Sequence, residues 1–128
     1  MKSLVALLAC MIAFPLMLQA KHAHAADLLD TGNDFLLQCD EEKLNKSNAA
    51  SVAQYMRCAG YIQGFLEGHT VMIVVSGAKP SYCYPENVST EQVGRIVTKS
   101  LKDHPEKTQL PISVLMEKAL IDAFPCDK

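Results

Sequence analysis

The middle of the chain carries its longest regular pattern of apolar residues, and this pattern predicts one long α-helix. The apolar side chains recur at the 3.6-residue period of a helix, at Tyr55, Ala59, Ile62, Leu66 and Ile73. Asn48 or Ser51 is suited to cap its start. The β-branched run 71–75 favours a strand by propensity alone, but no second strand is predicted to pair with it. We therefore extend the helix to about Ser76, where Gly77 can adopt the left-handed conformation that follows a helix.

The opposite side of this predicted helix is formed by three glycines, Gly60, Gly64 and Gly68, spaced four residues apart. Such positions lie nearly above one another on a helix, so the glycines form a shallow helix-packing groove. Each interior glycine costs about 0.5 to 1 kcal/mol relative to alanine, which indicates that something approaches the backbone closely there. We expect a helix to cover the groove, either from the same domain or from a twin subunit or another partner. Charged residues in the segment, such as Arg57 and Glu67, argue against a membrane span.

Three shorter helices are predicted around the long one. Each combines a residue suited to start a helix with apolar positions, and a cysteine or proline marks its end. They span about residues 31–39, 90–103 and 111–124, and they begin at Thr31 or Asn33, at Ser89 and at Pro111. The predicted fold class is therefore all-α: a small domain of four to five helices with one long central helix.

Residues 1–25 have the features of a secretory signal peptide that is cleaved from the mature protein. Lys2 supplies a positive start, an apolar stretch follows, and Ala23-His24-Ala25 forms a small-x-small cleavage site. We therefore expect a periplasmic protein with a single helical domain, residues 26–128. No later segment offers the roughly 18 uncharged apolar residues of a membrane span, so we expect no membrane association after cleavage.

The charge balance of the mature part narrows the choice of partner. Removal of 25 residues from the 128 leaves 103, with 10 basic and 14 acidic residues and a formal net charge of about −4. This balance, without a basic cluster, argues against nucleic acid as a partner. The chain has no Trp and few Tyr and Phe, so a surface that stacks on bases or sugars is poorly supplied.

The mature part contains an even number of cysteines in a chain with an export signal, and this favours two disulfides. A four-cysteine zinc site is the alternative, but the chain has no Cys-x-x-Cys pair. The two C-terminal helices have equal predicted lengths, so their hairpin returns Cys126 to Cys83. The loop after the first helix can fold Cys39 back against Cys58. We therefore predict the pairs Cys39–Cys58 and Cys83–Cys126.

Candidate catalytic chemistry is sparse. The mature part has two histidines, His69 and His104, and neither belongs to a recognisable catalytic motif. We interpret His69, near Glu67, as a polar residue close to the helix surface, and His104, before Pro105, as a helix-end residue. No cysteine is left over as a nucleophile, and there is no phosphate-binding loop. We therefore expect no catalytic residues, no metal and no cofactor, and so no enzyme.

The loop that follows the long helix is the preferred binding surface. Its two tyrosines flank Cys83, and a loop that a disulfide holds rigid loses little conformational entropy on binding. An alternative is that one tyrosine packs beneath the loop as part of the core. The turn at residues 103–109 is a second candidate surface. The partner-binding candidates in the loop are Lys79, Tyr82, Tyr84 and Glu86.

Several short motifs of glycine, cysteine and proline follow one another along the mature chain. They are Cys58-x-Gly60-Tyr61-Ile62-x-Gly64, Tyr82-Cys83-x-Pro85, His104-Pro105, and Ala119-Leu120 through Phe124-Pro125-Cys126. In order and spacing they resemble the Rap/Tai family of type VI secretion immunity proteins, and the resemblance covers most of the mature chain. It implies a small helical periplasmic protein, often dimeric, that binds and blocks a peptidoglycan amidase effector.

The function expected from these features is that of a homodimeric periplasmic immunity protein that occludes a secreted cell-wall amidase without chemistry of its own. A small helical chaperone of the periplasm is the alternative, because it would share export, helices and disulfides but would expose apolar surface in acid. A hydrolase that depends on His69 is the third hypothesis.

Overall fold

The computed structural model describes residues 28–44 and 47–126, and the named elements within them are all helices. In chain order they are α2 (Gly32–Gln38), α3 (Ala49–Ser76), α4 (Thr90–Asp103), the 3₁₀ helix η2 (Pro105–Lys107) and α5 (Ile112–Ala123). The predicted all-α fold with one long helix is confirmed. The predicted signal peptide, residues 1–25, lies outside the described residues.

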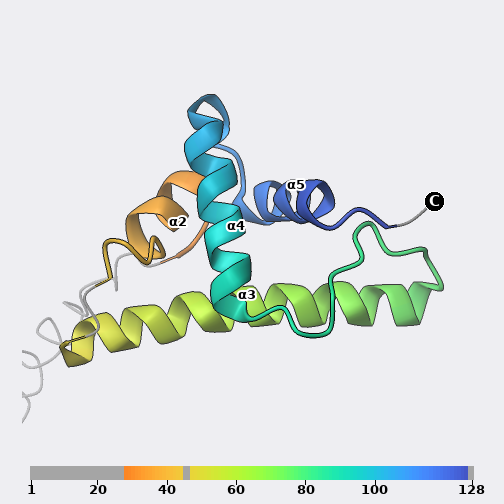
Figure 1. The fold of residues 1–128 in the computed structure, drawn as a ribbon, viewed down its shortest axis with the longest axis horizontal. Coiled ribbons are helices and arrows are strands. Elements are labelled where there is room, and N and C mark those ends of the chain that lie inside the picture. Colours follow the sequence, from red (N-terminus) through yellow and green to blue (C-terminus); the bar gives the residue numbers. More distant parts are fainter. Residues whose placement is uncertain (1–27, 45–46, 127–128) are drawn as a thin grey trace, which may run out of the picture.

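α4 lies at the centre of the arrangement (Figure 1). It runs across α3 near the middle of that long helix, with α2 and α5 on its two sides. α4 contacts all three of these helices, and α2 also contacts α5. An isolated antiparallel bridge between Thr31 and Pro111 joins the start of α2 to the start of α5. The chain therefore closes its core around α4 rather than around the longest helix.

The helix boundaries follow from local capping. The Thr31 hydroxyl accepts a hydrogen bond from the Asp34 amide, and the Asp34 carboxylate accepts one from the Thr31 amide, which completes a capping box. The Asn48 side chain caps α3 at the predicted start. Gly77 ends α3 at φ 67°, the left-handed conformation that glycine adopts without strain. Pro111 is the N-cap of α5, one residue before the position predicted for it.

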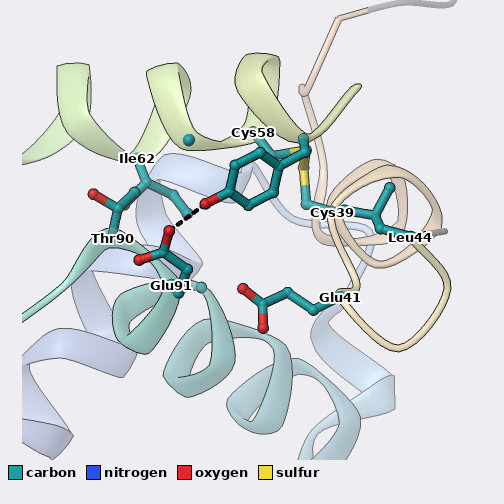
Figure 2. A pocket seen from close by; sticks show the side chains of 10 residues that line it. Cys39, Glu41, Leu44, Cys58, Ile62, Thr90 and Glu91 are labelled. Atoms are coloured by element: carbon teal, nitrogen blue, oxygen red, sulfur yellow. Dashed lines mark hydrogen bonds between the residues drawn. A yellow bond between two sulfur atoms is a disulfide. The ribbon is translucent and has the colours of Figure 1, made fainter. Parts of the chain in front are cut away.

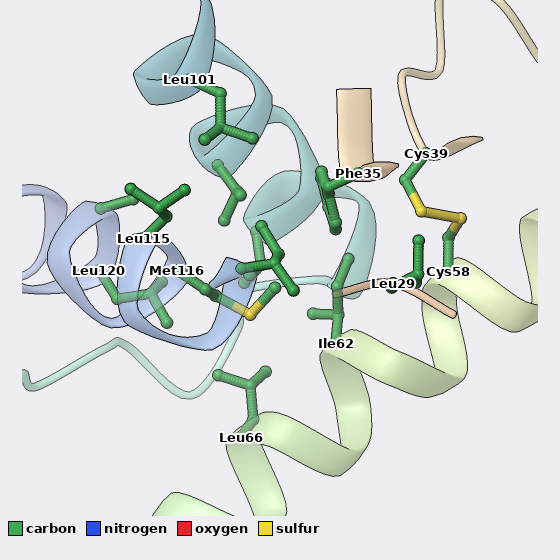
Figure 3. Packing of buried hydrophobic residues seen from close by; sticks show 14 of the residues in the cluster. Leu29, Phe35, Cys39, Cys58, Ile62, Leu66, Leu101, Leu115, Met116 and Leu120 are labelled. Atoms are coloured by element: carbon green, nitrogen blue, oxygen red, sulfur yellow. A yellow bond between two sulfur atoms is a disulfide. The ribbon is translucent and has the colours of Figure 1, made fainter. Parts of the chain in front are cut away.

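The core is formed where α4 meets α2 and α5 (Figure 3). Phe35 of α2 is fully buried there. α3 adds only a narrow strip, made of Cys58, Ile62 and Leu66, which lies on the predicted apolar side of the helix. The buried apolar residues of α4 and α5 are Val93, Val97, Leu101, Ile112, Leu115, Met116, Ala119 and Leu120.

The helix-packing groove is open on the side of α3 that faces away from α4. A Cβ atom built on Gly60, Gly64 or Gly68 would meet no atom of the described residues within 4 Å. The expectation that a helix of the same domain covers these glycines is therefore wrong, because α4 packs on the opposite, apolar strip of α3. Cover by a second subunit remains a prediction.

Both disulfides join the predicted partners. Cys39 and Cys58 are linked with their Cα atoms 5.6 Å apart, and Cys83 and Cys126 with theirs 4.9 Å apart. The links close sequence separations of 19 and 43 residues. By loop entropy they stabilise the fold by about 3 and 4 kcal/mol. Cys39 and Cys58 are buried, whereas Cys83 is exposed.

Gly32 should be much less tolerant of a side chain than Gly94, although both lie in helices. A Cβ at Gly32 would lie 2.7 Å from the Leu115 side chain and 3.0 Å from the Thr108 carbonyl oxygen, whereas one at Gly94 meets only Ile62, at 3.5 Å. We expect Gly32→Ala to destabilise the protein by roughly 1 to 3 kcal/mol through overpacking. Gly94→Ala should be neutral or stabilise it by up to about 1 kcal/mol. Urea unfolding measures both, and equal midpoints would contradict the packing described for Gly32.

Candidate functional site

The loop between α3 and α4 is held against the C-terminal end of the chain. The Cys83–Cys126 disulfide is its covalent link. The Cys83 amide also donates a hydrogen bond to the Phe124 carbonyl oxygen, over 2.9 Å. The loop therefore has a fixed position relative to both α3 and α5, although it contains no helix or strand.

Tyr82 is part of the core and not a binding residue. Tyr82 is 2 % exposed, and its ring stacks on that of His69 with the ring centroids 4.1 Å apart. Burial is the largest cause of a raised pKa of the Tyr82 phenol, and the nearby Glu117 and Tyr84 raise it further. The assignment of Tyr82 as a partner-binding candidate is therefore wrong, and the alternative of one tyrosine packed beneath the loop is the arrangement found. The sequence could not choose between Tyr82 and Tyr84, because a loop has no periodicity.

His69 links the loop to α3 and, through Ser81, to α5. Its side chain is 7 % exposed, so it is not the surface residue that the sequence suggested. Its Nε2 atom lies 2.9 Å from Ser81 Oγ, and Ser81 Oγ donates a hydrogen bond to Glu117 Oε1. Because a hydroxyl has one proton to donate, Ser81 accepts its second bond from His69 Nε2–H. Glu67, the neighbour considered for His69, instead accepts a hydrogen bond from Gln63.

The Ser81, His69 and Glu117 side chains do not have the geometry of a hydrolase triad. In such a triad the carboxylate binds the imidazole nitrogen that faces away from the serine, and the other nitrogen takes the serine proton. Here the carboxylate accepts the serine proton directly, and Glu117 Oε1 lies 4.0 Å from the same Nε2 atom that binds Ser81. The serine is therefore not activated as a nucleophile. The three side chains form a hydrogen-bonded contact that joins α3, the loop and α5.

The exposed part of the loop lies beside the apolar end of α3. Tyr84 is 36 % exposed, and Lys79 and Glu86 are exposed as well. A hollow of about 340 Å³ separates the loop from the last turns of the helix. Its lining residues are His69, Thr70, Ile73, Val74, Pro80, Tyr82, Cys83 and Tyr84. We call this hollow, together with Lys79 and Glu86, the loop surface.

The loop surface is apolar, with little charge. Between Glu67 and Glu86, Lys79 is the only residue with a fixed charge. Val74 and Val75 are more than three-quarters exposed at the end of α3. Contiguous exposed apolar residues around a hollow are typical of protein-binding surfaces. The sequence identified Lys79, Tyr84 and Glu86 for this surface but missed the valines, because their pattern was used to assign the helix.

The turn at residues 103–109 forms a different kind of surface. It contains η2, and the exposed carboxylate of Glu106 lies within ion-pair distance of the exposed side chains of His104 and Lys107. His104 is the C-cap of α4, as predicted. Exposed ion pairs contribute little to stability or binding energy. This turn is therefore a weaker candidate for a binding anchor than the loop surface.

A second polar region lies between α2 and α4, and the sequence did not single it out. Asp40 is 2 % exposed, and the Lys102 ammonium group lies 3.0 Å from its Oδ2 atom. Lys102 also donates to Glu42, and the pair of carboxylates, Glu42 foremost, raises the pKa of Lys102. Arg95 pairs with Glu41 over 3.4 Å on the same side. These charges are already compensated within the chain, so the region serves to join the loop after α2 to α4.

A small pocket between α3 and α4 is too small to bind a ligand (Figure 2). The Cys39–Cys58 disulfide lies at one end, and Tyr55 donates a hydrogen bond to Glu91 across the other. Its volume of about 20 Å³ accommodates about one water molecule. Among the described residues no group of three or more His, Cys, Asp or Glu side chains could hold a metal ion. None of the described helices is long and apolar enough to cross a membrane.

Comparison with known proteins identifies one family. A family model described as Rap1a immunity proteins matches residues 31–126, which include α2, α3, α4 and α5 and all four disulfide cysteines. No curated protein and no solved structure matches the chain.

The buried Tyr82 phenol should make the stability depend on pH in alkaline solution. The pKa of Tyr82 is raised above the usual value of about 10. The protonated phenol therefore makes its full contribution to the free energy of unfolding below about pH 10, and this contribution is lost as the pH rises further. Tyr82→Phe should therefore lose less stability than wild type between about pH 9 and pH 11. Near pH 7 Tyr82→Phe should be as stable as wild type or slightly more stable, because the buried Tyr82 hydroxyl has no hydrogen-bond partner among the described residues. Urea unfolding at several pH values measures this. Tyr84→Phe is the matched control, and a wild-type pH slope in Tyr82→Phe would contradict the assignment.

Proposed function

The chain belongs to the Rap1a immunity protein family and so acts against a secreted effector, and we propose that this effector is a peptidoglycan amidase of a type VI secretion system. We place the encounter in the periplasm, where the protein, acting as a homodimer, occludes the active-site cleft of the amidase. The observation that carries the proposal is the family match over residues 31–126, which agrees with the order of motifs in the chain.

Two further features support the periplasm as the site of action. The N-terminal residues have the composition of an export signal. Two disulfides brace the domain, and such bonds form and persist in oxidising compartments such as the bacterial periplasm.

The proposed mechanism is occlusion by the loop surface. The loop is held in place before binding by the Cys83–Cys126 disulfide, the buried Tyr82 ring and the hydrogen bond from Ser81 to Glu117. Little conformational entropy is therefore lost when the amidase binds. The hollow can accept an apolar side chain of the amidase, with Tyr84 at its edge as an aromatic anchor. Lys79 adds a positive charge that can pair with a carboxylate beside that contact. Such inhibition needs no reaction, in agreement with the inactive arrangement of the Ser81, His69 and Glu117 side chains.

A chaperone is the second candidate function, and one observation favours it. Val71, Met72, Val74 and Val75 are all at least half exposed at the end of α3. Exposed apolar residues of this kind can also hold unfolded clients. Unlike a dedicated inhibitor, a chaperone would bind unrelated unfolded proteins.

Co-expression tests the proposed function. The candidate amidase, directed to the periplasm, should lyse cells that lack this protein and spare cells that contain it, and the two proteins should copurify. Equal lysis in both cultures, with no complex, would overturn the immunity proposal. Suppression of aggregation of an unrelated unfolded protein in acid, with the same lack of a complex, would support the chaperone instead.

Tyr84→Ala should weaken amidase binding by about 2 kcal/mol, or roughly thirtyfold in Kd, mostly through faster dissociation. Leu37→Ala is the matched control, because Leu37 is an exposed apolar residue of α2, away from the loop surface. Surface plasmon resonance with immobilised amidase measures both variants. Equal affinities for Tyr84→Ala and wild type would mean that the loop surface is not the contact, and the turn at residues 103–109 would be tested next.

A further inference from the structure

The last two turns of α3 expose apolar side chains on more than one side of the helix. These turns extend beyond α4, at the opposite end of α3 from α2 (Figure 1). We call their four exposed apolar residues the valine tip; each is between 50 % and 81 % exposed, and they are Val71, Met72, Val74 and Val75.

The directions of these side chains indicate the kind of partner that can cover them. At 100° per residue the four positions spread over about 160° of the helix circumference. A helix packs on a neighbour through a stripe that is about 100° wide. A partner that covers the whole valine tip must therefore surround it instead of meeting a single face.

The hydroxyl groups at the two ends of the valine tip are turned back onto the helix. Thr70 Oγ1 donates a hydrogen bond to the Leu66 carbonyl oxygen over 3.1 Å, and Ser76 Oγ donates one to the Met72 carbonyl oxygen over 2.7 Å. Ser76 Oγ also accepts a hydrogen bond from the Ala78 amide. A polar group that already has a partner within its own segment leaves water at a lower cost in free energy. The valine tip is therefore suited to an environment that contains little water.

The charges near the valine tip suit a surface with negative charge. Between Glu67 and Glu86 the only residue with a fixed charge is Lys79, which follows the end of α3 by three residues. Its flexible stem can pass along apolar residues and place the ammonium group beside anionic headgroups. No carboxylate within this stretch opposes that contact.

The length of the valine tip matches the depth of an interfacial contact. Residues 71–76 are about 9 Å long, and interfacial helices enter a bilayer to a depth of roughly 5 to 10 Å. Glu67 lies one helical turn before Val71 on the same side of α3. Its carboxylate belongs in water and so limits the depth of insertion.

We propose that the valine tip inserts into the surface of a lipid bilayer with anionic headgroups, while the rest of the domain stays in water. Fluid acyl chains can surround the tip without a preformed groove. The expectation of no membrane association considered only a spanning segment, and a contact at the bilayer surface needs none. The proposal goes beyond the proposed function and does not depend on it.

Vesicle flotation with the full mature chain tests the contact. The vesicles contain about three parts phosphatidylethanolamine to one part phosphatidylglycerol, at up to about 5 mM lipid. Wild-type protein should float with them, and less of it should float with vesicles of phosphatidylcholine alone. Val71→Glu/Met72→Glu should lower the partition coefficient at least about tenfold, because two charges would have to enter the bilayer surface.

The matched control is Leu37→Glu/Val114→Glu, which adds the same charge at exposed apolar residues of α2 and α5. This variant should float as wild type does. Wild-type protein that stays unbound at the highest lipid concentration would overturn the proposal. Equal flotation of wild type and Val71→Glu/Met72→Glu would overturn it as well.

A fluorescent probe tests which part of the protein meets the lipid. An environment-sensitive fluorophore on Val75→Cys, with both disulfides intact, should shift its emission to the blue when the vesicles are added. The same fluorophore on Leu37→Cys should show no shift. A shift at Leu37 without one at Val75 would mean that another surface adsorbs to the vesicles, and the valine tip would not be the contact.

The lipid contact and the amidase contact can fail separately. Val71→Glu/Met72→Glu should keep the wild-type Kd for the amidase, because neither residue lines the hollow of the loop surface. Failure of the co-expression experiment would leave the flotation result unchanged. Loss of amidase binding in Val71→Glu/Met72→Glu, together with no flotation of the wild type, would assign the valine tip to a protein partner and overturn the lipid contact.

Discussion

Three side chains of α3, those of Cys58, Ile62 and Leu66, provide the buried strip that holds a 28-residue helix to the domain. Burial of one such apolar side chain contributes about 1.5 to 3 kcal/mol, and each disulfide contributes about as much or more. The covalent links are therefore as important as the core for the position of α3. One fixes its first half through Cys58, and the other fixes the loop that follows its last turn.

The parts of the fold that depend on local chemistry were predictable from the sequence. Thr31, Asn48 and Ser89 each cap a helix through their own side chains, and Gly77 ends one through its own backbone. The two disulfide pairs were predicted correctly as well, but the equal hairpin used to predict Cys83–Cys126 is not found. α4 and α5 have 14 and 12 residues and lie at a steep angle to each other (Figure 1). The capping inferences need only residues that are close in sequence.

The parts that depend on distant contacts were not predictable. Periodicity shows that α3 has an apolar strip and a glycine groove, but not which of the two the domain covers. The contact of Ser81 with Glu117 joins residues 36 positions apart, and that of Lys102 with Glu42 joins residues 60 apart. Tyr82 and Tyr84 have the same chemistry in the same loop, but Tyr82 is the one that is buried, with its ring stacked on that of His69. For the candidate site, the sequence therefore located the loop but not its inward and outward sides.

The exposed Cys83–Cys126 bond has a consequence for when the protein is active. In a reducing cytosol the two thiols stay separate, whereas the domain reaches its cross-linked form only after oxidation. The sulfur atoms of Cys39 and Cys58 are shielded by the core, so a reductant reaches Cys83 first. A newly made chain would therefore carry a loop that is tied only by noncovalent contacts until it is oxidised. Under the proposed function, the loop surface would mature only after export to the periplasm, and a chain kept in the cytosol would be a poorer inhibitor than the exported one.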